Sequence, residues 1–191
     1  MLNHFGLREK LLFSPLSNPN RLQSDSVDLF TIGIAPGSMN TPEKRLPVSE
    51  WVKICRGMQK GLDELKIDFR IELFGTSKDR PICKEIVERL GEFMLQDYSG
   101  DTTLVQLAEK FKDLDLLICN DSGAMHLGNI LGIPIAAICS VTNKDATGPI
   151  FDAPKFLFDV DCDGSIESFS SDFVKKLLDW FFDLYEIKIN G

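Results

Sequence analysis

The sequence of 191 residues lacks several features that would assign it to a familiar class. No apolar run reaches the roughly 18 residues of a membrane-spanning helix, so no transmembrane segment is predicted. The first residues mix apolar side chains with His4, Arg8 and Glu9, which is unlike a signal peptide. Basic residues form no long run, and the net charge of -8 opposes binding to nucleic acid or to an anionic membrane surface.

The usual sequence motifs of redox, nucleotide and hydrolase sites are also missing. The cysteines are odd in number and scattered, without a Cys-x-x-Cys pair, which is typical of reduced thiols in a cytoplasmic protein. There is no G-x-x-x-x-G-K-[ST], and no G-x-G-x-x-G follows the first predicted strand, so a P-loop NTPase or a dinucleotide-dependent oxidoreductase is not expected. Without a G-x-S-x-G elbow, a Ser-His-Asp hydrolase is not supported either.

Short apolar runs alternate with amphipathic stretches along most of the chain. Strands are predicted at the apolar runs, and helices at stretches with apolar residues three and four apart. The predicted strands are 31–35, 69–74, 114–119, 135–139 and 156–158, and the predicted helices cover about 48–65, 82–93, 104–111, 123–131 and 171–185. This alternation predicts βαβ units, and hence an α/β fold with a Rossmann-like parallel sheet and helices on both faces.

Local signals mark several element boundaries. Thr103 and Gln106 have the spacing of a capping box, and Leu104 is expected on the apolar face of the helix that follows. Gly132 should end the next helix, and Ser171 is expected to cap the last one. Residues 1–30 have the composition of a linker, so the domain is predicted to span 31–191.

The most distinctive stretch is Asn120-Asp121-Ser122-Gly123-Ala124-Met125-His126, which follows a predicted buried strand and begins a helix. The free N–H groups and dipole of a helix N-terminus favour an anion, and ligands of parallel sheets bind outside the carboxyl ends of the strands. His126 lies one helical turn beyond Ser122 and should face the same way. A hydrogen-bonded core histidine is the structural alternative.

Three other predicted strands also end in small polar loops, at Pro36-Gly37-Ser38, Gly75-Thr76-Ser77 and Ser140-Val141-Thr142. In a parallel sheet these loops meet at one edge, although turns and caps alone can explain such residues. The basic pair Lys44-Arg45 lies in a loop at that edge, where it is either the counter-charge of a phosphate or a solvated pair.

One acidic stretch near the C-terminus resembles part of a calcium-binding motif. Asp159-x-Asp161-x-Asp163-Gly164 matches the first half of an EF-hand calcium loop. Position twelve is Ser170 where a bidentate Glu is needed, and no entering helix precedes the motif. We therefore expect no metal site, and an acidic surface turn is favoured over a calcium-dependent interaction domain.

Taken together, the motifs resemble a known family. They are Pro36-Gly37-Ser38, Lys44-Arg45-x-Pro47, Leu73-Phe74-Gly75-x-x-x-Asp79, Asn120-Asp121-Ser122-Gly123-x-Met125-His126, Gly132-x-Pro134, and Thr142 with Thr147-Gly148-Pro149. In this order and spacing, over about residues 31–150, the chain resembles the family nine glycosyltransferases, which include the ADP-heptose:lipopolysaccharide heptosyltransferases.

The resemblance implies the C-terminal, nucleotide-sugar-binding half of a GT-B glycosyltransferase. It implies that Ser38 and Lys44 contact the phosphates or sugar of the donor and that Thr102 lies near the nucleoside. It also places Asp121, Ser122, Gly123 and His126 around the junction of diphosphate and sugar. The donor would be of the ADP-heptose type, and no metal cofactor would be required.

The same resemblance leaves the acceptor side outside this chain. Transfer to the lipopolysaccharide core would need an acceptor site and a catalytic base from an N-terminal domain, either missing or separately encoded. The protein would then be cytoplasmic, held at the inner membrane through its partner or acceptor. The alternative is a non-catalytic module that binds a nucleotide-sugar or a phosphate, such as a decayed half enzyme.

Overall fold

A six-stranded parallel sheet forms the centre of the computed structural model, which describes residues 29–38, 45–91, 95–139, 148–159 and 166–185. The sheet order is β3-β2-β1-β4-β5-β6, and every neighbouring pair is parallel. The strands are β1 (Phe30–Ala35), β2 (Phe69–Leu73), β3 (Leu95–Asp97), β4 (Leu116–Asn120), β5 (Ile135–Cys139) and β6 (Lys155–Asp159). The predicted doubly wound α/β fold is therefore confirmed.

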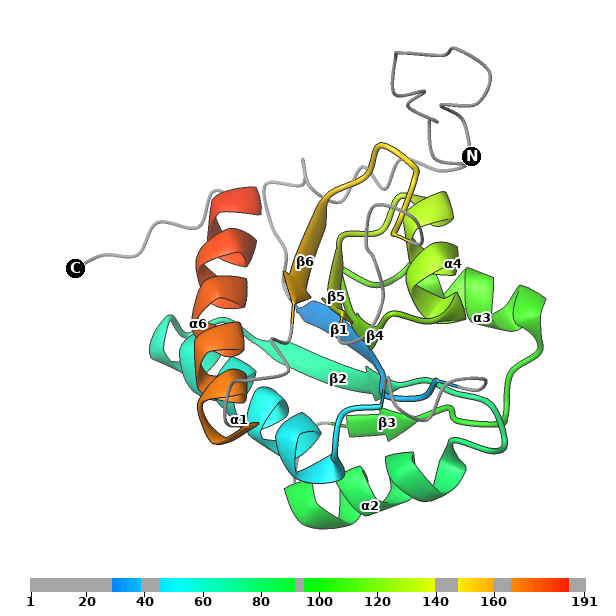
Figure 1. Ribbon diagram of the computed structural model, residues 1–191, viewed down its shortest axis with the longest axis horizontal. Coiled ribbons are helices and arrows are strands. Elements are labelled where there is room, and N and C mark those ends of the chain that lie inside the picture. Colours follow the sequence, from blue (N-terminus) through cyan, green and yellow to red (C-terminus); the bar gives the residue numbers. More distant parts are fainter. Residues whose placement is uncertain (1–28, 39–44, 92–94, 140–147, 160–165, 186–191) are drawn as a thin grey trace.

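Helices cover both faces of this sheet (Figure 1). One face carries α1 (Val48–Glu64), α2 (Arg80–Leu90) and α6 (Ile166–Leu184), and the other carries α3 (Leu104–Phe111) and α4 (Gly123–Leu131). The chain runs outward from β1 to β3 and then returns to the other side of β1 to form β4. The strand order thus reverses between β1 and β4, which is where open α/β sheets bind ligands.

The central strands read as continuous apolar runs because both of their faces are buried. In β4, Leu116 and Ile118 join the core beneath α1, α2 and α6, whereas Leu117 and Cys119 join the core beneath α3 and α4. All five residues of β4 are buried, including its last residue, Asn120. A polar amide is therefore held inside the sheet at the point where the candidate site begins.

Two of the predicted helix boundaries are confirmed by their local geometry. Thr103 and Gln106 form a complete capping box at the start of α3. Gly132 ends α4 in the left-handed conformation with a φ of 78°, which glycine adopts without the steric cost of a Cβ atom.

Other sequence predictions were wrong. The strand β3 was missed, and α2 ends at Leu90 before Gly91, which has a φ of 70°. The last helix begins at Ile166, so Ser171 lies inside α6 and does not cap it. Leu104 is predicted on the apolar face of its helix, but it is 72% exposed because α3 begins there, at the end of its buried stripe.

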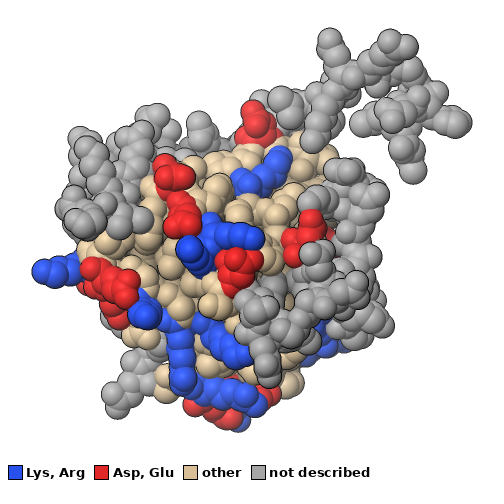
Figure 2. All heavy atoms as spheres, turned by 60° about the vertical axis from the view of Figure 1, so that its left-hand side comes forward, with Lys and Arg blue, Asp and Glu red and all other residues tan. Residues whose placement is uncertain are grey.

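The described surface carries mixed charge. Figure 2 brings the left-hand side of Figure 1 forward, and on that face the basic and acidic side chains lie among one another. No helix within the described ranges is long and apolar enough to cross a membrane. Across those same ranges, no three His, Cys, Asp or Glu residues form a group that could hold a metal ion.

Candidate functional site at the carboxyl edge of the sheet

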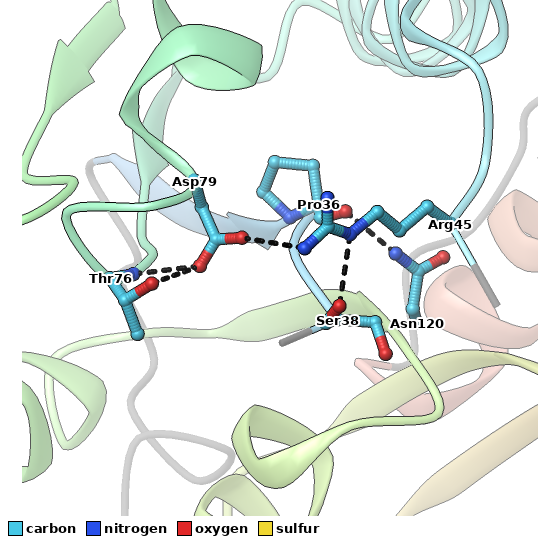
Figure 3. Close-up of polar contacts among 6 residues, drawn as sticks. All are labelled: Pro36, Ser38, Arg45, Thr76, Asp79 and Asn120. Carbon is cyan, nitrogen blue, oxygen red and sulfur yellow. Dashed lines mark hydrogen bonds and ion pairs between the residues drawn. The ribbon is translucent and has the colours of Figure 1, made fainter. Parts of the chain in front are cut away.

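Asn120 joins the two strands that flank the reversal of strand order. Its side chain is fully buried at the end of β4, and its Nδ2 donates a hydrogen bond of 2.7 Å to the carbonyl oxygen of Pro36. Pro36 directly follows β1, so this bond ties the loop containing Ser38 to the start of the Asp121–Gly123 turn (Figure 3). The Oδ1 atom of Asn120 is buried and has no hydrogen-bond partner among the residues that the structure describes.

Asp79 organises the loop after β2. The residue is 3% exposed, and its Oδ2 accepts hydrogen bonds from the backbone N–H of Thr76 at 2.9 Å and from the hydroxyl of Thr76 at 2.7 Å. The carboxyl group of Asp79 also packs against Gly37. A Cβ atom added at Gly37 would lie 2.4 Å from the Cγ atom of Asp79. A larger residue than glycine would therefore disturb the contact between the loops after β1 and β2.

Arg45 bridges these same two loops. Its Nε donates a 2.9 Å hydrogen bond to the carbonyl oxygen of Ser38, and its Nη2 lies 3.8 Å from Oδ1 of Asp79 (Figure 3). The guanidinium is thus a local counter-charge for a buried carboxylate and a fixed support for the Ser38 loop. Arg45 is partly buried in this position, so the solvated-pair interpretation is wrong for this member of the Lys44-Arg45 pair.

The N-terminus of α4 is open at this edge. Ser122 occupies the N-cap position with extended backbone angles, but its side chain makes no capping hydrogen bond. Gly123 is exposed, and among the described residues beyond its own helix turn no heavy atom lies within 4 Å of the position that a Cβ atom would take there. The first turn of α4 therefore offers backbone N–H groups, the positive end of a helix dipole and free space at one point.

The other predicted site residues lie at or near the same edge. Ser38 and Asp121 are each 5% exposed, so both are built into the floor formed by β1 and β4. Thr102 is half-buried just before α3. His126 is exposed on α4, so the alternative of a core histidine is wrong.

Some predicted features lie outside the described residues. These are Lys44, the loop 140–147 that includes Ser140, Val141 and Thr142, and most of the calcium-like motif, Asp161 to Gly164.

Three residues of the site framework were not among the predicted site residues. Asn120 and Asp79 stand in the quoted motifs, and Arg45 stands in the basic pair with Lys44, but the sequence gives none of the contacts that these residues make within the site. Their polar character at strand ends was visible in the sequence. Their mutual contacts depend on the sheet order, which joins loops that are distant along the chain.

Burial also makes the nearby cysteine unreactive. Cys119 precedes Asn120 and is fully buried, and burial, reinforced by Cys139 and Asp121, raises the pKa of its thiol far above the ordinary value. A thiol that stays protonated is a poor nucleophile, so Cys119 contributes packing and not covalent chemistry.

The fold is an α/β domain with a doubly wound parallel sheet, and the polar loops after β1, β2 and β4 lie together at the carboxyl edge of that sheet. The sequence pattern of glycosyltransferase family 9 (heptosyltransferase) matches residues 5–161. The chain therefore belongs to glycosyltransferase family 9.

Individual relatives agree with this assignment. Lipooligosaccharide heptosyltransferase 2 of Haemophilus influenzae is 27% identical over 124 residues, covering 63% of this chain and 34% of the relative. The structure of Escherichia coli ADP-heptose lps heptosyltransferase II matches with a TM-score of 0.69 and 23% identity, over 88% of this chain and 50% of that chain. The structure of Escherichia coli heptosyltransferase WaaC with ADP matches with a TM-score of 0.64 and 14% identity, over 87% and 51% of the two chains.

The lengths of these matches are informative. The chain spans about a third of the length of the curated relatives and about half of the solved heptosyltransferase chains. It corresponds to one half of a GT-B heptosyltransferase fold.

Proposed function

We propose that this chain is the donor-binding domain of a heptosyltransferase-like enzyme and that it binds a nucleoside-diphosphate sugar of the ADP-heptose type. The observation that carries the proposal is the open N-terminus of α4 at the carboxyl edge of β4. Backbone N–H groups at such a terminus stabilise phosphate oxygens. The names of two similar proteins, one with ADP-heptose and one with ADP, support the choice of this ligand class.

The glycine at position 123 supports the same ligand. A glycine in a helix costs stability relative to alanine, and here neither φ nor a close neighbour in the described part of the chain requires it. An unneeded glycine at a helix N-terminus leaves room for a diphosphate to approach the backbone closely. The fold thus gives up some stability at a point where a ligand benefits from the missing side chain.

The proposed reaction is a single in-line displacement. The acceptor hydroxyl oxygen forms a bond to the anomeric carbon, the bond from that carbon to the diphosphate oxygen breaks, and the hydroxyl proton passes to a base. The N–H groups of Gly123 and Ala124 stabilise the negative charge that develops on the leaving diphosphate. Lys44 would add positive charge, and Asp121 and His126 would orient the sugar.

The acceptor and the base belong, in this proposal, to a second domain. The lipopolysaccharide core is the proposed acceptor, and the protein would work on the cytoplasmic side of the inner membrane together with that domain. The second candidate is a module that binds the same donor without transferring it.

The experiment is calorimetric titration of the full chain with ADP and with ADP-heptose, each with and without EDTA. Wild type is compared with Gly123→Ala and with the control Glu88→Ala, an exposed residue near the end of α2. We expect Gly123→Ala to weaken ADP binding by roughly tenfold or more, about 1.4 kcal/mol, without lowering the melting temperature. The control should bind like wild type, and EDTA should have no effect.

Two results would contradict the proposal. If wild type and Gly123→Ala bind ADP with equal affinity, the diphosphate does not rest on the first turn of α4. Absence of ADP and ADP-heptose binding by wild type would reject the donor-binding function itself. If the donor binds, adding the N-terminal half of a family member together with its acceptor separates the two candidates, because only a transferase domain then transfers the sugar to the acceptor hydroxyl and releases ADP.

A further inference from the structure

The strand β6 (Lys155–Asp159) forms one outer edge of the sheet (Figure 1). Within the described ranges its sheet partner is β5, and the opposite edge of the sheet is the three-residue strand β3. An edge strand presents a row of backbone N–H and C=O groups to which another strand can bind, and natural proteins often keep such strands short. The strand β6 is longer than β3 and apolar in its middle, so it can accept a further strand.

The pairing with β5 determines which backbone groups of β6 face the open edge. Ile135 lies opposite Lys155, and the N–H of Ile135 donates a 3.0 Å hydrogen bond to the carbonyl oxygen of Pro154. In a parallel pair this bond means that alternate residues of β6, beginning with Pro154 and Phe156, direct their backbone groups toward β5. The residues whose N–H and C=O groups face the open edge are therefore Lys155, Leu157 and Asp159.

The sequence of β6 is complementary to itself in the antiparallel direction. When Leu157 lies opposite Leu157 of a second copy, Lys155 lies opposite Asp159 of that copy. Phe156 then lies opposite Phe158. Opposite charges and aromatic pairs both stabilise neighbouring strands. The residues whose backbone groups face the open edge form the hydrogen-bonded pairs of this ladder, so the charges and the backbone require the same register.

The two charges lie at the two ends of the strand. The Nζ atom of Lys155 donates hydrogen bonds to the carbonyl oxygens of Phe151 at 3.0 Å and of Pro149 at 3.5 Å. These bonds hold the ammonium group beside the start of β6, and one of its three donors remains for a carboxylate. Asp159 is exposed at the other end and lies on the same face of the strand as Lys155. Both charges are thus available to a second copy.

We infer that β6 is a homodimer interface, through which two copies of this chain pair antiparallel about a twofold axis at Leu157. A twofold interface requires a surface that is complementary to itself, and the strand has this property. The pairing joins the two six-stranded sheets into one continuous sheet. The interface is independent of the proposed donor site, because β5 separates β6 from β4.

The test is sedimentation equilibrium of the full chain at protein concentrations up to about 0.5 mM. Wild type should form a dimer as the concentration rises. Lys155→Asp and Asp159→Lys each place like charges opposite one another at both ends of the ladder, so each should weaken dimerisation by roughly tenfold or more. Combining the two substitutions restores opposite charges, and the double variant should dimerise within about threefold of wild type.

Matched controls separate this pairing from a general effect of charge. Lys84→Asp and Glu88→Lys change the net charge by the same amounts on the exposed face of α2, and each should dimerise like wild type. Circular dichroism verifies that every variant is folded. The double variant also lacks the contacts that Lys155 makes within its own chain, so rescue by this variant can arise only from pairing between copies.

Hydrogen exchange by NMR locates the interface within the chain. The amides of Lys155, Leu157 and Asp159 should exchange more slowly at high protein concentration. Those of Phe156 and Phe158, which are bonded to β5, should be unaffected by concentration. The inference is wrong if wild type stays monomeric throughout, if the double variant dimerises no better than the single variants, or if this alternation is absent from a dimer that does form.

Discussion

Replacement of Asp79 by alanine is the sharpest test of how the site is built. The carboxylate is buried, accepts two hydrogen bonds from Thr76 and faces Arg45, while Gly37 and Gly75 pack against it. Its loss removes the group that closes the loop after β2. The same loss leaves Arg45 without its buried counter-charge.

The size of the expected loss of stability follows from these contacts. A hydrogen bond to a charged group contributes about 1.5–3 kcal/mol, and because Thr76 is exposed and regains water we use the lower value for each bond. The two bonds then give a loss of about 3 kcal/mol. For a chain of this size, 1 kcal/mol lowers the melting temperature by about 2–4 °C, so we expect a decrease of about 6–12 °C.

The assay is thermal unfolding followed by circular dichroism. Thr76→Ala, which removes the hydroxyl but keeps the backbone N–H, should lose about 1 kcal/mol. Asp79→Asn keeps a single acceptor oxygen, so its melting temperature should lie between those of Asp79→Ala and Thr76→Ala. A melting temperature of Asp79→Ala within 2 °C of wild type would refute the assignment of Asp79 as the support of this loop.

Three further predictions concern the rest of the domain. Burial raises the pKa of Glu72, with Arg70 opposing, so the folded state loses stability as pH rises through that pKa. We expect Glu72→Gln to melt higher than wild type at pH 7, with the gain absent below the ordinary value of 4.5. Burial raises the pKa of Cys55 and of Cys83 to about 12, so iodoacetamide at pH 8 should label them in urea but not in the folded protein, as read by mass spectrometry. Gly132→Ala should lower the free energy of unfolding in urea by about 1 kcal/mol, because the φ of 78° is strained for alanine.

Elements with strong local signals could be predicted from the sequence. The strands β1, β4 and β5 are buried on both faces, which requires the continuous apolar runs that were recognised. The capping box of α3 and the glycine that ends α4 depend on local backbone chemistry, so they too were visible.

Elements set by tertiary packing could not be predicted. The strand β3 has only three residues, none of them fully buried. Neither an apolar run nor an alternation of apolar and polar residues therefore marks it in the sequence. Ser171 is a good capping residue, yet α6 continues through it from Ile166. The exposure of Leu104 is invisible to periodicity, because periodicity gives the side of a helix but not where the sheet beneath it ends.

The candidate site also combines features that the sequence predicts with features that depend on tertiary packing. Sheet topology predicts that polar loops after parallel strands meet at one edge, and the loops after β1, β2 and β4 do so. The bonds of Arg45 to Ser38 and Asp79 are specific long-range contacts. No local pattern encodes them, so the framework of the site emerged only from the structure.

The central claim is that a donor diphosphate rests on the first turn of α4. Hydrogen exchange of the full chain, measured with and without saturating ADP, tests this most directly. The account predicts slower exchange of the backbone amides of Gly123 and Ala124, with β6 and α6 unchanged. The claim would be contradicted if ADP slowed exchange only in the segment 155–159, or only at places other than the loops after β1, β2, β3 and β4.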